Sequence, residues 1–357
     1  MDLKVVIAAG GTGGHLFPGI AVAQEFQARQ AAVTFFTSPR PMTTRILAGY
    51  GFAWETISSR AIQGQGIWGR LRALLAVPGS VRQAKGRLQA LAPHLVLGMG
   101  GYTAGPVGLA AYLLGIPLAL HEQNAIPGFA NRRLTRLASR IFVSFPATLS
   151  HFPPERCLWT GNPIRAEFFH IAAERASAPF TVLITGGSQG AHHLNVEVLR
   201  ALPLLQDEKD RLRFMHLTGE ADEQMVAAGY REQGFAAEVA AFTTEMPDLM
   251  ARAHLIISRA GASTLAEITA LGRAALLVPY PFAANNHQEY NARFLAAAGA
   301  GEMILNKDFT AALFAGKIRE FLAQPEKLRE MEAASRRLAK PDAAREIVKG
   351  CLELVNK

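Results

Sequence analysis

The stretch LKVVIAAGGTGGHLFPG, residues 3–19, joins an apolar run to a glycine-rich turn and then to a helical pattern. The stretch FTVLITGGSQGAHHLN, residues 180–195, repeats this order. Strand, glycine turn and helix in succession are typical of the first unit of a Rossmann-like sheet. We therefore expect an α/β protein with two Rossmann-like parallel-sheet domains that face each other across a cleft. Other short apolar runs predict further buried strands at residues 32–36, 95–97, 117–120, 140–143, 213–217, 254–257 and 275–278.

The chain has 357 residues, which is longer than a single domain with one hydrophobic core usually is. Glycine and proline in TGNP, residues 160–163, mark the expected boundary. The sequence predicts a first domain over 1–161 and a second over 162–340. An amphipathic segment within 341–357 is expected to form a closing helix that packs back on the first domain.

Positive charge is concentrated in the first half of the chain. Residues 1–161 hold 15 Lys and Arg against 5 Asp and Glu, whereas residues 162–357 hold 22 against 24. No acidic residue occurs from 56 to 121. Such a half favours an anionic partner, either a phosphorylated substrate or an anionic membrane surface. Nucleic acid is not expected, because no RNA-binding or zinc-finger motif accompanies the charge.

Three further patterns concern the compartment. The two cysteines have no CxxC spacing, so neither a zinc site nor a disulfide framework is expected. The start of the chain lacks the basic region of a secretory signal. The uncharged segment 95–120 is long enough to cross a membrane, but its six glycines favour strand, helix and strand instead. A soluble protein in a reducing cytosol fits these features.

Glycine turns that lead into helices present backbone N–H groups and a helix dipole, and they commonly bind phosphate. A dinucleotide GxGxxG fingerprint would need glycine at Leu16, and a P-loop would need GK[ST], which is absent. Neither NAD nor a Walker-type ATPase is indicated. The alternative is that these glycines only allow tight packing of strand on helix. Duplication of the turn favours two phosphate-bearing substrates.

Seven motifs stand in order along the chain: GGTGGHLFPG (10–19), GMGGYTAGP (98–106), HEQNAIPG (121–128), TGNPIR (160–165), GGSQGA (186–191), SRAGASTLAE (258–267) and NNHQEYNA (285–292). Together they resemble the MurG family of glycosyltransferases, glycosyltransferase family 28, which has the GT-B fold. The resemblance implies inverting transfer of GlcNAc from UDP-GlcNAc to the muramic acid 4-hydroxyl of lipid I. Lipid I is the undecaprenyl diphosphate-linked muramyl pentapeptide, and the product is lipid II of peptidoglycan synthesis.

The resemblance also implies the substrate-binding residues. In the second domain they would be Arg165, Ser188, Thr243, Ala262, Ser263, Thr264, Leu265, Ala266, Glu267 and Gln288. Of these, Ser188 would lie near the diphosphate, Glu267 would accept both ribose hydroxyls and Gln288 would reach the sugar. From the first domain, Thr12, Gly13, Gly14 and Asn124 would complete the pocket. Without the resemblance, Glu267 could equally be a first-turn acid favoured by the helix dipole.

The residue that accepts the proton is left open. His15 follows the first glycine turn and would face the cleft, as a base or as a ligand of the acceptor diphosphate. His121 and Glu122 open a strand-end loop and compete for the role of base, so that Glu122 is a candidate beside His15. His192 and His193 follow the second turn and are interpreted as structural.

No cofactor and no tightly bound metal are expected. The seven aspartates include no DxD pair, the usual holder of a divalent ion in enzymes that use nucleotide sugars. Helix dipoles and Arg165 would then stabilise the departing UDP.

An apolar stripe with basic neighbours predicts reversible binding to an anionic membrane surface. Its members are Ile67, Trp68, Leu71, Leu74 and Leu75, followed by Arg82 and Lys85. The expected location is the cytoplasmic face of the bacterial plasma membrane, as a peripheral protein. A core helix with a solvated basic face would show the same stripe.

Two other functions share these features. One is a different GT-B enzyme, such as a glycolipid synthase or a UDP-GlcNAc epimerase, of which an epimerase needs no lipid-binding patch. The other is a non-catalytic scaffold that binds nucleotide sugars at the membrane. Turnover without an acceptor would indicate an epimerase, and binding without transfer to lipid I would indicate the scaffold.

Overall fold

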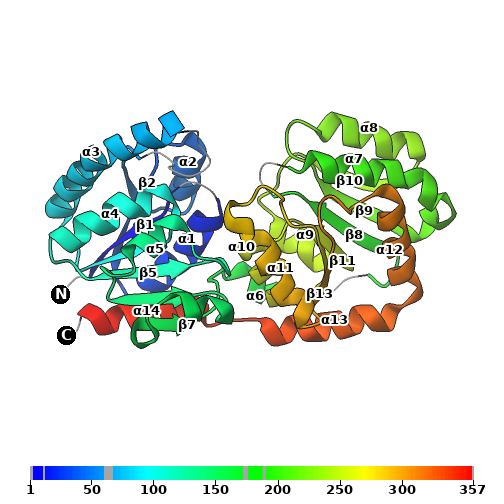
Figure 1. The fold of residues 1–357 in the computed structure, drawn as a ribbon. Coiled ribbons are helices and arrows are strands. Elements are labelled where there is room, and N and C mark those ends of the chain that lie inside the picture. Colours follow the sequence, from blue (N-terminus) through cyan, green and yellow to red (C-terminus); the bar gives the residue numbers. More distant parts are fainter. Residues whose placement is uncertain (1–2, 11–12, 60–66, 172–175, 188–189, 356–357) are drawn as a thin grey trace. The chain divides into compact units, whose positions relative to one another are not determined.

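The computed structural model of the chain describes residues 3–10, 13–59, 67–171, 176–187 and 190–355, with backbone only for 67–74. The chain forms two compact units (Figure 1). The first comprises Met1–Arg165 and Lys340–Lys357, and the second comprises Ala166–Ala339. The chain therefore leaves the first unit after Arg165, a few residues beyond the expected boundary, and re-enters it at Lys340.

The first unit contains a seven-stranded sheet in which every neighbouring pair is parallel. The strand order is β3-β2-β1-β4-β5-β6-β7. This is the Rossmann order, with one additional strand. The strands are β1 (Lys4–Ala8), β2 (Ala32–Thr37), β3 (Ala53–Thr56), β4 (Leu95–Gly98), β5 (Leu118–Glu122), β6 (Arg140–Val143) and β7 (Cys157–Trp159).

Helices cover both faces of this sheet. Successive residues of β1 point to opposite faces, and the side chains on each face are buried against helices. Val5 and Ile7 pack with α1, α2 and the C-terminal α14, whereas Val6 and Ala8 pack with α3, α4 and α5. Both chain termini lie in this unit (Figure 1). Its helices are α1 (Gly13–Gln27), α2 (Pro41–Gly49), α3 (Ile67–Leu91), α4 (Gly101–Leu113), α5 (Phe129–Leu134), η1 (Pro146–His151), η2 (Pro154–Arg156) and α14 (Ala343–Val355).

The second unit repeats the same topology with six parallel strands. Their order is β10-β9-β8-β11-β12-β13. The strands are β8 (Phe180–Thr185), β9 (Leu212–Leu217), β10 (Ala236–Ala240), β11 (Leu255–Ser258), β12 (Ala274–Leu277) and β13 (Gly301–Met303).

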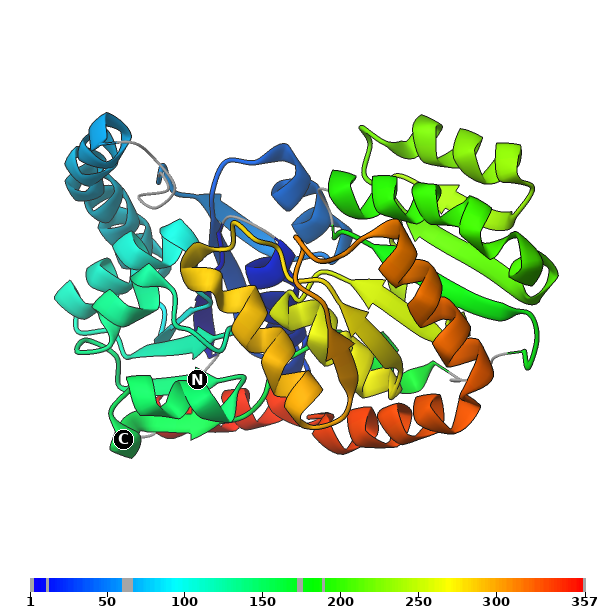
Figure 2. The ribbon, with the colours of Figure 1, turned by 45° about the vertical axis from the view of Figure 1, so that its right-hand side comes forward.

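Helices of the second unit likewise lie on both faces of its sheet (Figure 2). Val182 and Ile184 of β8 pack in one buried cluster with α7, α8, α12 and α13. Helix α10 adjoins both α9 and α11. The helices are α6 (Glu167–His170), α7 (His192–Ala201), η3 (Leu202–Arg211), α8 (Glu223–Gln233), α9 (Met246–Arg252), α10 (Ala262–Leu271), η4 (Ala284–Asn286), α11 (His287–Ala297), α12 (Ala311–Ala323) and α13 (Pro325–Leu338).

The uncharged segment 95–120 forms β4, α4 and the start of β5. Its helix has 13 residues and is largely buried in the first unit. Across the described part of the chain, no helix combines the length and apolar character needed to cross a bilayer.

Candidate functional site

Each sheet has a topological switch point that is bordered by two glycine-containing turns. In the first unit these turns follow the adjacent strands β1 and β4, and they lead into α1 and α4 on opposite faces. In the second unit they follow β8 and β11 and lead into α7 and α10. Open α/β sheets bind ligands at this position, outside the carboxyl ends of the strands.

The two turns of the first unit touch each other. A Cβ atom at Gly101, whose φ is +74°, would lie 2.0 Å from the carbonyl oxygen of Gly10. A Cβ at Gly10 would in turn lie 2.1 Å from Oγ1 of Thr103. Only glycine fits at these two positions. The turns are therefore held together by direct backbone contact.

His15 lies in the first turn of α1, next to this contact. Its side chain is half-buried, and its Nδ1 atom lies 3.3 Å from Oε1 of Gln123. Gly13 and Gly14 begin the same helix, and Gly14 is exposed. Thr12 lies outside the described residues. Of the residues expected at the first turn, the structure thus brings His15, Gly13 and Gly14 to the switch point.

Glu122 ends β5 and is buried, with 1% of its surface exposed. Its carboxylate accepts hydrogen bonds from the backbone N–H of Asn124 at 3.0 Å and of Gly128 at 2.9 Å. The Nδ2 group of Asn131 donates a further one at 2.8 Å. Burial raises the pKa of Glu122, and these donors oppose that rise. The carboxylate therefore organises the 122–128 loop, which carries the candidate residue Asn124.

His121, the other candidate base, is fully buried. Its Nε2 lies 3.2 Å from the carbonyl oxygen of Gly161. Burial lowers the pKa of His121 to about 4, and the positive charge of a protonated His15 contributes to the lowering. The ring is neutral at pH 7. Its contact with Gly161 links β5 to the stretch of chain just before Arg165, where the chain leaves the first unit.

In the second unit, the SRAG turn leads into α10, which begins at Ala262. Ala262 and Leu265 are buried, whereas Ser263, Thr264, Ala266 and Glu267 are half-buried. No acidic residue lies in the first turn of this helix. The interpretation of Glu267 as a first-turn acid favoured by the dipole is therefore wrong, because that effect fades beyond the first turn.

Helix α11 holds the SRAG turn by two side-chain amides. Oε1 of Gln288 accepts the backbone N–H of Ala260 at 3.1 Å and that of Tyr280 at 2.9 Å. Nδ2 of the buried Asn291 donates to the carbonyl oxygen of Ala260 at 3.1 Å. Gln288 thus links the turns that follow β11 and β12. Asn291 lies in the motif 285–292, but it was not among the predicted site residues.

The second glycine turn is also closely packed. Gly187 and Gly190 have φ of +83° and +72°, and a Cβ at Gly190 would lie 2.2 Å from the carbonyl oxygen of Thr218. Ser188 lies outside the described residues. His193 bonds the carbonyl oxygens of Asn306 and Phe309 through Nε2, at 2.9 and 3.1 Å.

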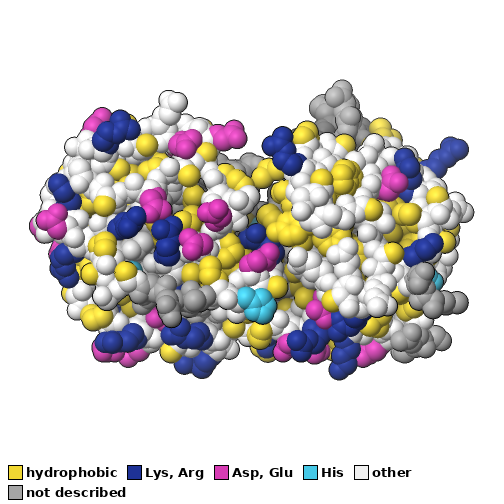
Figure 3. Space-filling view, turned by 180° about the vertical axis from the view of Figure 1, so that it is seen from behind, with side chains coloured by type: hydrophobic (Ala, Val, Ile, Leu, Met, Phe, Trp, Pro, Cys, Tyr) yellow, Lys and Arg dark blue, Asp and Glu magenta, His cyan; other side chains and the backbone are white. Residues whose placement is uncertain are grey.

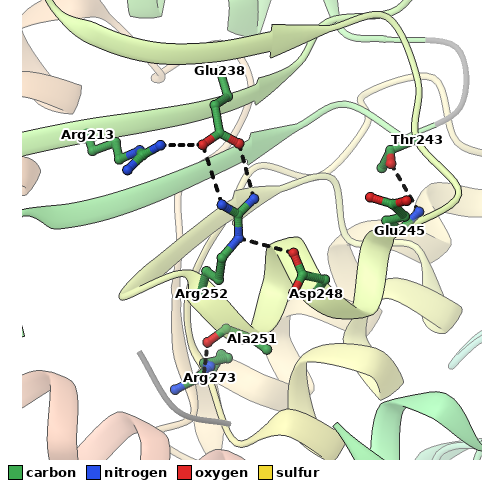
Figure 4. A network of polar contacts seen from close by, with 8 residues as sticks. All are labelled: Arg213, Glu238, Thr243, Glu245, Asp248, Ala251, Arg252 and Arg273. Carbon is green, nitrogen blue, oxygen red and sulfur yellow. Dashed lines mark hydrogen bonds and ion pairs between the residues drawn. The ribbon is translucent and has the colours of Figure 1, made fainter. Parts of the chain in front are cut away.

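Thr243 lies in the loop between β10 and α9, where its hydroxyl accepts the backbone N–H of Glu245 at 3.0 Å (Figure 4). Beside this loop, Glu238 pairs with Arg252 and Arg213. Arg252 is the main cause that holds the pKa of Glu238 below its usual range. The ion-pair network joins the start of β9, the middle of β10 and the end of α9.

Arg165 is the last residue of the first segment of the first unit. The structure thus places it in the first unit, whereas the sequence assigned it to the second domain. Its guanidinium lies over the ring of Phe17 in α1, 5.1 Å from the ring centre. It therefore packs on the helix that begins with Gly13 and carries His15.

The apolar stripe and its basic neighbours, which predict membrane binding, lie on α3. Leu75 is 73% exposed, Arg82 is exposed and Lys85 is half-buried. Further along, the helix packs through Ala84 and Leu88 in the core that includes α4. The side chains of Ile67, Trp68, Leu71 and Leu74 lie outside the described residues. In the second unit, on the left in Figure 3, acidic and basic side chains are interspersed.

Models of known protein families match most of the chain. The glycosyltransferase family 28 N-terminal domain matches residues 5–143, and the glycosyltransferase family 28 C-terminal domain matches residues 181–347. Residues 13–14, 15, 122 and 124 lie in the first match, and residues 262–267 and 288 lie in the second.

Relatives match over nearly the whole length. A UDP-N-acetylglucosamine--N-acetylmuramyl-(pentapeptide) pyrophosphoryl-undecaprenol N-acetylglucosamine transferase of Syntrophus aciditrophicus is 42% identical and covers 99% of both chains. The transferase of the same name from Geobacter sulfurreducens is 43% identical and covers 97% of both.

Solved structures give the same result for the fold. MurG of Acinetobacter baumannii superimposes with a TM-score of 0.80 at 33% identity, covering 98% of this chain and 99% of that one. A UDP-GlcNAc 2-epimerase from Neisseria meningitidis, covering 98% and 100%, shares the fold at a TM-score of 0.71 but only 16% identity. The expected GT-B fold is confirmed, and the chain belongs to glycosyltransferase family 28.

Proposed function

We propose that this glycosyltransferase moves GlcNAc from UDP-GlcNAc to the muramic acid 4-hydroxyl of lipid I and so forms lipid II. The observation that carries the proposal is identity above 40% over almost the full length to transferases named for this reaction. The duplicated switch point supports it, because each unit offers glycine turns and helix N-termini suited to a phosphate-bearing substrate. The UDP-GlcNAc 2-epimerase is only 16% identical, so its similarity concerns the fold and gives no support for an epimerase reaction.

UDP-GlcNAc binds, in this proposal, chiefly to the second unit. The diphosphate meets the turn that contains Ser188, and Glu267 accepts the ribose hydroxyls from the half-buried side of α10. The NH₂ group of Gln288 faces the sugar, and the backbone at Thr243 meets the uracil. The remaining proposed contacts are Ala262, Ser263, Thr264, Leu265 and Ala266 of α10, and Thr12, Gly13, Gly14, Asn124 and Arg165.

The chemistry is a single displacement. The acceptor hydroxyl oxygen forms a bond to the anomeric carbon while the bond from that carbon to the UDP oxygen breaks, which inverts the configuration. His15 takes the hydroxyl proton. Its half-buried position at the switch point suits this role better than the position of Glu122, whose carboxylate is occupied by donors of its own loop. Helix N-termini stabilise the negative charge of the departing UDP.

Lipid I is held in a membrane, and we place the enzyme at the cytoplasmic face of the plasma membrane through α3. The exposed Leu75 and the acid-free stretch from 56 to 121 support this location. Each basic residue near an anionic surface contributes on the order of 1 kcal/mol.

The proposal is tested by transfer of labelled GlcNAc to a short-chain lipid I analogue. Glu267→Ala is expected to raise the KM for UDP-GlcNAc about 10- to 100-fold, because it removes charge-assisted hydrogen bonds. His15→Ala is expected to lower kcat by about 100-fold or more with little change in KM. Matched controls are Glu223→Ala, a first-turn acid of α8, and His151→Ala, an exposed histidine in η1. Binding of UDP-GlcNAc without any transfer by the wild-type enzyme would refute the proposal.

A further inference from the structure

The orientation of the Gln123 side-chain amide is determined by the backbone beside it. Gln123 directly follows β5 and is 2% exposed. Its Nε2 group donates a hydrogen bond to the carbonyl oxygen of Met99 at 2.7 Å. Because the NH₂ group is directed to Met99, Oε1 is the atom that faces His15, at 3.3 Å from Nδ1. An amide oxygen can only accept, so Nδ1 of His15 carries the proton of this contact.

The plane of the imidazole is set by the turn after β4. A Cβ atom at Gly100, whose φ is +87°, would lie 3.1 Å from Cε1 and 3.2 Å from Nδ1 of His15. A Cβ at Gly101 would lie 3.3 Å from Cδ2 of the same ring. The ring therefore rests on the backbone of two glycines, where any larger residue would displace it. Met99, the acceptor for Gln123, directly precedes these glycines.

We propose that Gln123 is a positioning residue that holds neutral His15 in the Nδ1–H tautomer, so that Nε2 carries the lone pair that accepts the hydroxyl proton. This inference rests on the proposed function, in which His15 is the base. During transfer the proton moves from the acceptor hydroxyl to Nε2, while the proton on Nδ1 stays hydrogen-bonded to Oε1. In the other tautomer Nε2 would already be protonated and could not serve as the base.

Gln123 and the turn at Gly100 and Gly101 together hold the His15 ring in place. Gln123 joins the ends of three parts of the first unit, because it follows β5, donates to the residue after β4 and accepts from the first turn of α1. An amide is neutral, so it selects a tautomer without adding a charge beside the ring. The position is separated from His15 by 108 residues, and the fold brings the two together.

The test is ¹⁵N NMR of the His15 ring at a pH where it is neutral, with the signal assigned by His15→Ala. The two ring nitrogens have well separated shifts, so the spectrum reports the tautomer directly. Wild-type protein is expected to show a protonated Nδ1 and an unprotonated Nε2. Gln123→Met, which removes the acceptor at similar volume, is expected to convert a large fraction of the ring to the Nε2–H form. Its kcat should fall about tenfold with the KM for UDP-GlcNAc nearly unchanged.

Gln83→Met is the matched control. Gln83 also accepts a backbone N–H, from Ser58 at 2.9 Å, and donates to a backbone carbonyl, that of Thr56 at 3.1 Å. It lies in the same unit, so it reports the cost of losing such an amide elsewhere. The control should keep the tautomer of His15. Gln123→Glu retains an acceptor oxygen and is expected to restore the Nδ1–H form.

An Nε2–H ring in the wild-type protein overturns the inference, and this result needs no variant to fold. An unchanged tautomer in Gln123→Met also overturns it. The proposed function fails separately: if His15→Ala transfers GlcNAc normally while Gln123→Met shifts the tautomer, His15 is not the base but Gln123 still holds its ring.

Discussion

Two substitutions of Gln288 can distinguish the structural role of its side-chain oxygen from the proposed sugar contact of its NH₂ group. Gln288→Met keeps the volume of the side chain but removes the oxygen that accepts two backbone N–H groups. The N–H of Ala260 belongs to a residue with no exposed surface, whereas Tyr280 is 45% exposed, so water can replace the bond only at Tyr280. Leaving one buried donor without a partner costs about 1–3 kcal/mol.

This loss should appear in the unfolding of the second unit. For a unit of this size, 1 kcal/mol corresponds to a shift in Tm of about 2–4 °C, so we expect a decrease of about 2–12 °C, measured by calorimetry. The KM for UDP-GlcNAc should rise as well, because the SRAG turn ahead of α10 loses its link to the turn after β12.

Gln288→Glu is the informative control. A carboxylate still accepts both backbone N–H groups but has no NH₂ group to donate. Its Tm should stay close to that of the wild type, and any rise in KM would then report the lost contact to the sugar. Equal destabilisation by the Met and Glu variants, or a wild-type Tm in the Met variant, would refute this account of Gln288.

Three further predictions concern other parts of the molecule. Burial lowers the pKa of His216 to about 3, so only the unfolded chain binds its proton below pH 6.5. Stability should therefore be lost as the pH falls from 6.5 toward 3, by up to about 5 kcal/mol, and His216→Gln should flatten this dependence in denaturant titrations. Gly101→Ala should destabilise the first unit by about 3 kcal/mol or more, from positive φ and contact with a carbonyl, whereas Gly105→Ala on the same helix has open space and should be neutral or stabilising. Replacing Trp68 and Leu75 with serine should weaken binding to anionic liposomes and leave UDP binding intact; equal loss of both would indicate misfolding instead.

The interior of each sheet could be predicted from the sequence, but the edges could not. Strands such as β4 and β11 are buried on both faces and read as continuous apolar runs. The strands β3, β7, β10 and β13 were not predicted. They lie at or near sheet edges, where Trp54 and Glu238 are partly exposed and the apolar run is broken.

The candidate site shows the same division. Motifs located the glycine turns, His15 and α10, because those features are contiguous in sequence. Gln123 and Asn291 lie in the motifs 121–128 and 285–292, but the motifs did not indicate their partners, because each acts on a backbone group or side chain from a different strand end. Glu122 has the residue type of a base, and only its four donors reveal that it organises a loop.

The histidines that follow the two glycine turns show why contacts, and not position, assign a role. His193 follows the second turn much as His15 follows the first, yet its Nε2 is shared between two backbone carbonyls of the segment before α12. A proton on that nitrogen serves packing, so the ring cannot accept one there from a substrate. In His15 the bonded nitrogen is Nδ1 and its partner is an amide fixed by Met99. His192, the first residue of α7, likewise has its Nδ1 bonded, to the carboxylate of Asp222 at 2.9 Å. The two turns therefore differ in the partner of the ring, which is a neutral amide in the first unit and a carboxylate in the second.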